Sequence, residues 1–86
     1  MRFTVEERHL TDVNGRPVAA PDAVSFHSRE AENLDAVVRD YLVSGGAELI
    51  GDVLKFPGLQ AVATVRKTGG VYTLQITPSS QRDFRV

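Results

Sequence analysis

A chain of 86 residues with an ordinary globular composition can build one domain, but it is too short for two independent cores. It contains no cysteine, which excludes disulfides and thiolate metal sites and is typical of a cytoplasmic protein. No stretch has the length and apolar character of a signal peptide or a membrane span, so the sequence predicts a soluble protein.

The net charge of −1 is unevenly distributed. Residues 1–54 carry five arginines against ten carboxylates, whereas residues 55–86 carry five basic residues against one carboxylate. Such a division marks either an anion-binding surface or two halves that neutralise each other in the folded chain. The sequence favours the second interpretation.

The N-terminal segment, residues 3–10, predicts a strand because its residues alternate in character. One side of this strand carries Phe3, Val5, Glu7 and His9. Asn14-Gly15 follows and predicts a tight turn, since both residue types tolerate a positive φ.

The return from that turn is interrupted by two prolines, which predict an edge or irregular stretch over residues 16–21. Residues 23–27 predict a second strand, in which we expect Val24 and Phe26 to point toward the core.

The clearest predicted element is a helix over residues 29–44. Ser28 is a suitable N-cap, and Gly45-Gly46 provides the left-handed conformation that ends a helix. The apolar residues recur at helical spacing and form one stripe, made of Ala31, Leu34, Val37, Val38, Tyr41 and Leu42.

The last third of the chain predicts three antiparallel strands, at residues 48–56, 60–67 and 71–76. Pro57-Gly58 is expected to turn the chain between the first two, and Gly69-Gly70 to form the loop between the last two. In that register Ala61, Ala63 and Val65 share a face with Tyr72, Leu74 and Ile76.

The resulting order is ββαβββ, and one amphipathic helix needs one sheet face to cover. The sequence therefore predicts an α+β fold, a two-layer sandwich of one helix on a mainly antiparallel sheet. We expect residues 1–78 to form the domain and residues 79–86 a flexible tail, in which Phe84 is the only anchor.

No constellation of residues points to catalysis, a metal or a cofactor. His9 and His27 lack metal-ligand spacing, and Ser25 near His27 lacks a nucleophile motif. The glycine pairs do not follow the strand–loop–helix order of phosphate-binding loops.

Asp52 is the unusual acid, because it interrupts an apolar strand. A tight hairpin at Pro57-Gly58 would place it on the core face beside Ala63, whereas a bulge at Gly51 would turn it outward, and the sequence favours the bulge.

The sheet face away from the helix is the first candidate surface, because branched apolar residues lie there among polar ones. The sequence predicts a non-catalytic, bacterial-type interaction protein that forms a homodimer or binds a protein partner; inhibitors encoded by phages or mobile elements belong to this class. The expected contact residues are Leu49, Val53, Val62, Thr64, Val71 and Thr73.

The alternative is a nucleic-acid or anion-binding surface in the basic last third. Its expected residues are Arg66, Lys67, Arg82 and Arg85. No motif assigns the chain to a family, and the sequence favours the interaction protein over the nucleic-acid or anion-binding alternative.

Overall fold

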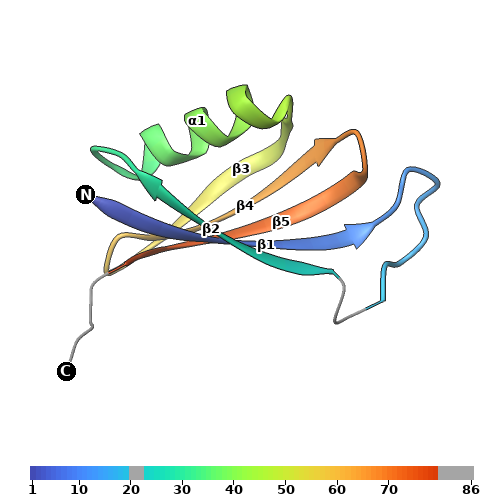
Figure 1. Cartoon of the computed structure of the whole chain (residues 1–86), viewed down its shortest axis with the longest axis horizontal. Coiled ribbons are helices and arrows are strands. Elements are labelled where there is room, and N and C mark those ends of the chain that lie inside the picture. The colour runs from blue at the N-terminus through green and yellow to red at the C-terminus, as the bar shows by residue number, and fades with distance from the viewer. Residues whose placement is uncertain (20–22, 80–86) are drawn as a thin grey trace.

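The computed structural model describes residues 1–19 and 23–79, which form a five-stranded antiparallel sheet with one helix on one face (Figure 1). The elements in chain order are the strands β1 (Arg2–Thr11) and β2 (Val24–Glu30), the helix α1 (Leu34–Gly45), and the strands β3 (Glu48–Phe56), β4 (Gln60–Lys67) and β5 (Gly70–Pro78). The predicted α+β fold with its ββαβββ order is confirmed.

The strand order, which the sequence left open, is β2-β1-β5-β4-β3. The last strand therefore lies in the middle of the sheet, antiparallel to β1 on one side and to β4 on the other. We call the face that carries α1 the helix-side face and the opposite one the outer face.

The core lies between α1 and the helix-side face. The helix contributes the predicted stripe, of which Leu34, Val37, Val38 and Tyr41 are buried. The sheet contributes small and branched side chains, which let the helix approach closely. These buried sheet residues are Phe3, Val5, Ala61, Ala63, Val65, Leu74 and Ile76.

The helix begins later than the sequence predicted. Its N-cap is Asn33, whose side chain accepts a hydrogen bond of 2.9 Å from the amide of Ala36, and not Ser28. Ser28 instead pairs with Thr4 in the β1–β2 ladder. The long first strand thus holds residues 28–30 extended, which overrides their local helical tendency. At the other end Gly46 has a φ of 61° and caps the helix as expected.

The prediction that Val24 and Phe26 point toward the core was wrong. Phe26 pairs with Glu6 on the outer face and is 67% exposed. The helix-side residues of β2 are Ser25 and His27, opposite Glu7 and Val5. The pairing with β1 decides this, because neighbouring residues on paired strands must point to the same face.

The loop between β4 and β5 is Thr68-Gly69, one residue earlier than predicted, since Lys67 pairs with Gly70. Arg66, for example, pairs with Val71 and not with Thr73 as predicted, which is a shift of two residues along β5. Because the shift is even, every side chain keeps its predicted face. Gly70 is needed in the strand because its φ is 128° and an added Cβ would lie 2.0 Å from the carbonyl oxygen of Thr11.

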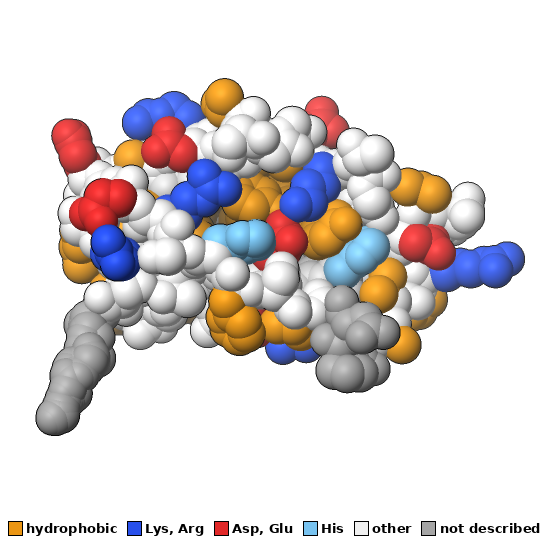
Figure 2. Space-filling model, viewed as in Figure 1, with side chains coloured by type: hydrophobic (Ala, Val, Ile, Leu, Met, Phe, Trp, Pro, Cys, Tyr) orange, Lys and Arg blue, Asp and Glu red, His pale blue; other side chains and the backbone are white. Residues whose placement is uncertain are grey.

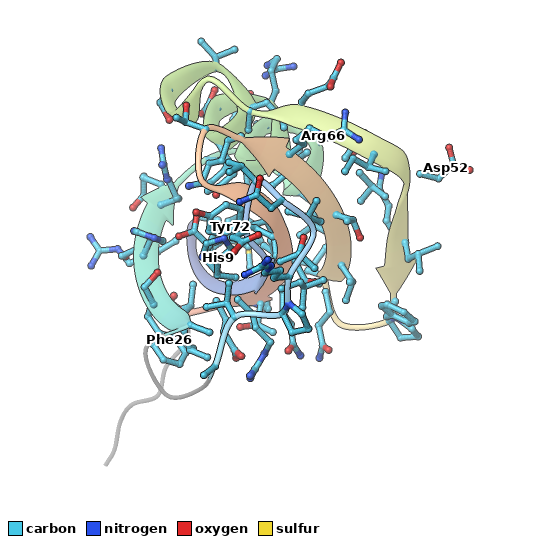
Figure 3. All side chains as sticks on the ribbon, turned by 90° about the vertical axis from the view of Figure 1, so that its right-hand side faces the viewer. His9, Phe26, Asp52, Arg66 and Tyr72 are labelled. Atoms are coloured by element: carbon cyan, nitrogen blue, oxygen red, sulfur yellow. The ribbon has the colours of Figure 1, made fainter. Side chains whose placement is uncertain are left out.

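The bulge in β3 is confirmed. The pairing with β4 shifts between Ile50 and Leu54, and Gly51 has a φ of 73°. Asp52 is exposed at this irregularity and, as Figure 3 shows, points away from the sheet.

The described residues include no helix that combines the length and the apolar character required to cross a bilayer. Of the predicted tail, only Ser79 is described; its amide donates to the carbonyl of Arg2. Phe84, Arg82 and Arg85 lie outside the described residues.

Candidate functional site

The helix-side face has a half that α1 does not cover. The helix packs over β4 and is tied to β3 by an ion pair between Asp35 and Lys55, 2.7 Å apart. The face of β1 and β2 beside it stays partly open. Figure 2 views this side and shows basic, acidic and histidine side chains gathered around apolar atoms below the helix.

A buried carboxylate organises this open half. Glu7 is 9% exposed and follows Phe3 and Val5 on the helix-side face of β1, as its place in the alternating sequence predicted. It accepts hydrogen bonds from Lys67 Nζ at 2.6 Å, from Ser25 Oγ at 3.2 Å and from the hydroxyl of Tyr41. His27 Nε2 lies 3.7 Å from the same carboxylate. We call these five residues the Glu7 cluster.

The protonation states in the cluster are mutually fixed. Burial by itself raises the pKa of Glu7, but the hydrogen bonds from Lys67 and Tyr41 and the charge of Lys67 outweigh it and lower the pKa to about 2. Burial and the hydrogen bond to Glu7 raise the pKa of Tyr41 to about 12. Burial lowers the pKa of Lys67, but the hydrogen bonds and charges of Glu7 and Tyr41 together outweigh this effect, and the pKa is raised.

An aromatic stack extends the cluster toward the end of β1. The rings of His9 and Tyr72 lie 4.1 Å apart and nearly parallel, side by side in Figure 3. His9 Nε2 is 2.8 Å from the carbonyl oxygen of Gly69. Lys67 Nζ lies 4.6 Å from the centre of the Tyr72 ring, so the lysine passes over an aromatic surface on its way to Glu7.

These contacts favour a structural role for the cluster. A general acid or base works best with a pKa near the operating pH, whereas the pKa values of Glu7 and Tyr41 are held far from neutrality. The sequence does not reveal this cluster, because its five members come from four different elements, β1, β2, α1 and β4. The available signal was an acid, Glu7, on the apolar side of an alternating strand.

The outer face contains four of the six predicted contact residues. Val62 and Thr64 lie there on β4, and Val71 and Thr73 on β5, where Thr64 pairs with Thr73. Leu49 and Val53 do not: both pack against the core on the helix side. Leu49 pairs with buried Val65. The bulge shifts the alternation of side chains in β3, so that Val53 points to the helix side and Leu54 to the outer face.

The apolar part of the outer face is therefore made partly of other residues. Leu54 pairs with Val62 and is 57% exposed, and Phe56 is 49% exposed. Ile50 lies on the same face opposite Thr64. We call Ile50, Leu54, Phe56 and Val62 the β3–β4 strip.

The predicted basic site is divided between two faces. Arg66 points to the outer face and forms an ion pair with Glu48 at 3.2 Å, whereas Lys67 points to the helix side and pairs with Glu7. Two neighbours on a strand cannot present both charges to one ligand. Arg82 and Arg85 lie outside the described residues.

Two further features carry no site. A cavity of about 240 Å³ lies between the turn after β1 and the β4–β5 hairpin, near Asp12 and Val71, and is smaller than the pockets of about 300 Å³ or more that enclose organic ligands. Within residues 1–19 and 23–79, no three His, Asp or Glu side chains are grouped so that they could hold a metal ion.

Comparisons of the chain with protein-family models, with curated proteins and with solved structures found no match.

Proposed function

We propose that this chain is a small, non-catalytic cytoplasmic interaction protein that forms a homodimer through the outer face of its sheet. The observation that carries the proposal is the β3–β4 strip, where Leu54 and Phe56 are about half exposed beside Val62. Large apolar side chains grouped on one open surface are typical of protein contacts.

The charges on the outer face support a second copy as the partner. They are already paired within the chain: Arg8 with Glu6 at 3.1 Å, Arg66 with Glu48 at 3.2 Å, and Arg2 with Glu30 at 3.5 Å. A neutral face of this kind can meet its own copy without repulsion between like charges. Closed two-fold symmetry is also the commonest form of self-association.

The size of the face is sufficient for a moderate interface. Strand spacing of about 4.8 Å across five strands, and about seven residues of about 3.3 Å along them, give a face of about 24 by 23 Å. The projected area is about 550 Å², and side-chain relief brings the accessible area closer to the 800 Å² or so that each partner contributes to a standard interface.

Sedimentation equilibrium of the full chain at micromolar to millimolar concentrations tests this proposal. The wild type is expected to rise from its monomer mass of 9.4 kDa toward twice that value. Leu54→Glu places a charge within the strip and is expected to weaken dimerisation at least tenfold.

Val43→Glu is the matched control, because it replaces an exposed apolar residue on α1 with the same charge. It is expected to dimerise like the wild type. A wild type that stays monomeric throughout, or a Val43→Glu variant that dissociates as readily as Leu54→Glu, contradicts the proposal.

A further inference from the structure

The two edges of the sheet differ in how well they are protected. At β3 the pairing is broken by the bulge at Gly51, and Asp52 projects from it. A bulge is one of the usual devices that prevent a further strand from adding to an edge. The other edge, β2, pairs with β1 over seven residues without any shift.

The hydrogen bonds of β2 define which of its backbone groups are free. At the two ends of the β1–β2 ladder, the amide of Ala31 donates to Met1 and the amide of His9 donates to Ala23. In an antiparallel pair, opposed residues alternately exchange two hydrogen bonds and none. Because both end pairs involve odd positions of the second strand, the even positions direct their N–H and C=O groups away from β1.

Four consecutive even positions form this free edge: Val24, Phe26, Ser28 and Glu30. No backbone hydrogen bond from residues 1–19 or 23–79 reaches their N–H or C=O groups. The edge thus offers regularly spaced donors and acceptors over the length of an ordinary strand, which is the arrangement that accepts an added strand.

The side chains along β2 specify what such a strand would carry on the helix side. Ser25, His27 and Arg29 line that side. The guanidinium of Arg29 lies 5.9 Å from the centre of the Tyr41 ring and 3.3 Å from Ser44 Oγ, and it forms no ion pair with a described residue. An added strand would place its side chains about 5 Å from these groups, where carboxylates are favoured.

The outer side of β2 favours a different kind of residue. Phe26 is the main feature there, and two thirds of it is exposed, pointing away from the sheet in Figure 3. Aromatic rings on a sheet pair best with apolar or β-branched cross-strand neighbours. Successive residues of a strand point to opposite faces, so an alternating acidic and apolar segment matches both sides at once.

We propose that the β2 edge binds an extended peptide segment of a partner protein in which acidic and apolar residues alternate. The backbone of the segment pairs with Val24, Phe26, Ser28 and Glu30, a carboxylate of the segment faces Arg29, and its apolar side chains cover Phe26. A second copy of β2 fits this edge less well. In an antiparallel pairing centred on His27, Arg29 would face Ser25, and no carboxylate would meet either basic group.

Fluorescence anisotropy with two labelled heptapeptides tests the proposal on the full chain. One peptide alternates Glu and Val, and the other alternates Lys and Val. The Glu/Val peptide is expected to bind, and Arg29→Glu is expected to weaken it at least tenfold while improving binding of the Lys/Val peptide. Arg39→Glu, an exposed charge reversal on α1, is the matched control and should bind the Glu/Val peptide within about twofold of the wild type.

Ser28→Pro separates strand addition from simple charge attraction. The amide of Ser28 points away from β1, so proline removes an edge donor without removing a ladder hydrogen bond. Circular dichroism should show a folded chain that binds the Glu/Val peptide at least tenfold more weakly. Should this variant fail to fold, Arg29→Glu still decides the charge preference.

Equal binding of both peptides, or no binding of the Glu/Val peptide, would overturn the proposal. So would a folded Ser28→Pro variant that binds like the wild type. Self-association that Ser28→Pro abolishes would assign the edge to a second copy instead. Leu54→Glu alters only the outer face, so at concentrations where the wild type is monomeric it should leave peptide binding unchanged, which separates this result from the homodimer proposed above.

Discussion

The helix-side face contains two regions of opposite character that meet at a single pair of residues. Leu74 and Glu7 face each other across the β5–β1 ladder. On one side of this pair Leu74 is followed by Ala63 under α1, and on the other Glu7 is followed by Ser25 in the open half. Along β1 itself the change falls between Val5, which belongs to the apolar core, and Glu7, which is the centre of the ion-pair cluster.

The size of the helix explains this boundary. Twelve residues make a helix about 18 Å long and about 10 Å wide, which covers two or three strands of a sheet that is about 24 Å across. The end of β1 beyond Val5 and the strand β2 are not closed by apolar packing. They are closed instead by long polar side chains, chiefly Lys67 and Tyr41, that converge on Glu7. A small domain can thus complete its core with a hydrogen-bonded cluster where it lacks a second helix.

The largest expected effect comes from the apolar region. Leu74→Ala should lower the free energy of unfolding by about 3 kcal/mol, because the side chain is fully buried and its removal leaves a cavity. Urea denaturation at low protein concentration measures this change. Leu54→Ala is the control, since this leucine is mostly exposed, and it should change stability by no more than about 0.5 kcal/mol. Similar losses in both variants would contradict the proposed division between core and surface.

The second-largest effect is expected in the polar region, at Glu7. Glu7→Gln should lower stability at pH 7 by about 3 kcal/mol, because it removes the carboxylate that pairs with the partly buried ammonium of Lys67. The folded pKa of Glu7, about 2, lies below the ordinary value of 4.5. The carboxylate therefore contributes stability above pH 4.5 and loses it as the pH falls toward 2.

The lowered pKa of Glu7 contributes about 3 kcal/mol to the free energy of unfolding above pH 4.5, and this contribution is lost as the pH falls toward 2. The difference in unfolding free energy between the wild type and Glu7→Gln should be largest above about pH 5 and should shrink steadily toward pH 2. A difference that stays constant over this range would show that Glu7 is not the ionised centre of the cluster.

The smallest effect concerns the start of the helix that covers the apolar half. Asn33→Ala should cost about 1 kcal/mol, because it leaves the amide of Ala36 without its capping acceptor. Ser28→Ala should cost much less, since the serine lies exposed on β2 and caps nothing. Thermal unfolding of the two variants compares them directly. A larger loss of stability for Ser28→Ala would show that Ser28, and not Asn33, caps the helix.

The sequence was informative wherever one local pattern decided the structure. The alternation of Phe3, Val5 and Glu7 placed all three on one face, and helical spacing identified Leu34, Val38 and Tyr41 as the buried stripe. Gly51 indicated the bulge that exposes Asp52. Each of these features depends on steric or hydrophobic preferences that act over a few residues.

The candidate sites depended on pairing between distant segments, which local patterns do not encode. The β1–β2 pairing held Ser28 in a strand, turned Phe26 outward and brought Ser25 beside Glu7. The shift in β3 moved Val53 inward and left Leu54 on the outer face.

By itself, the sequence determined the kinds of elements, their order and the buried side of the helix, because side-chain periodicity and glycine conformations are properties of short segments. The tertiary structure alone decided the strand order, the convergence of Lys67 and Tyr41 on Glu7, and which edge of the sheet stays open. These depend on the register of strands far apart in the chain, where a change of one residue reverses which face every side chain occupies.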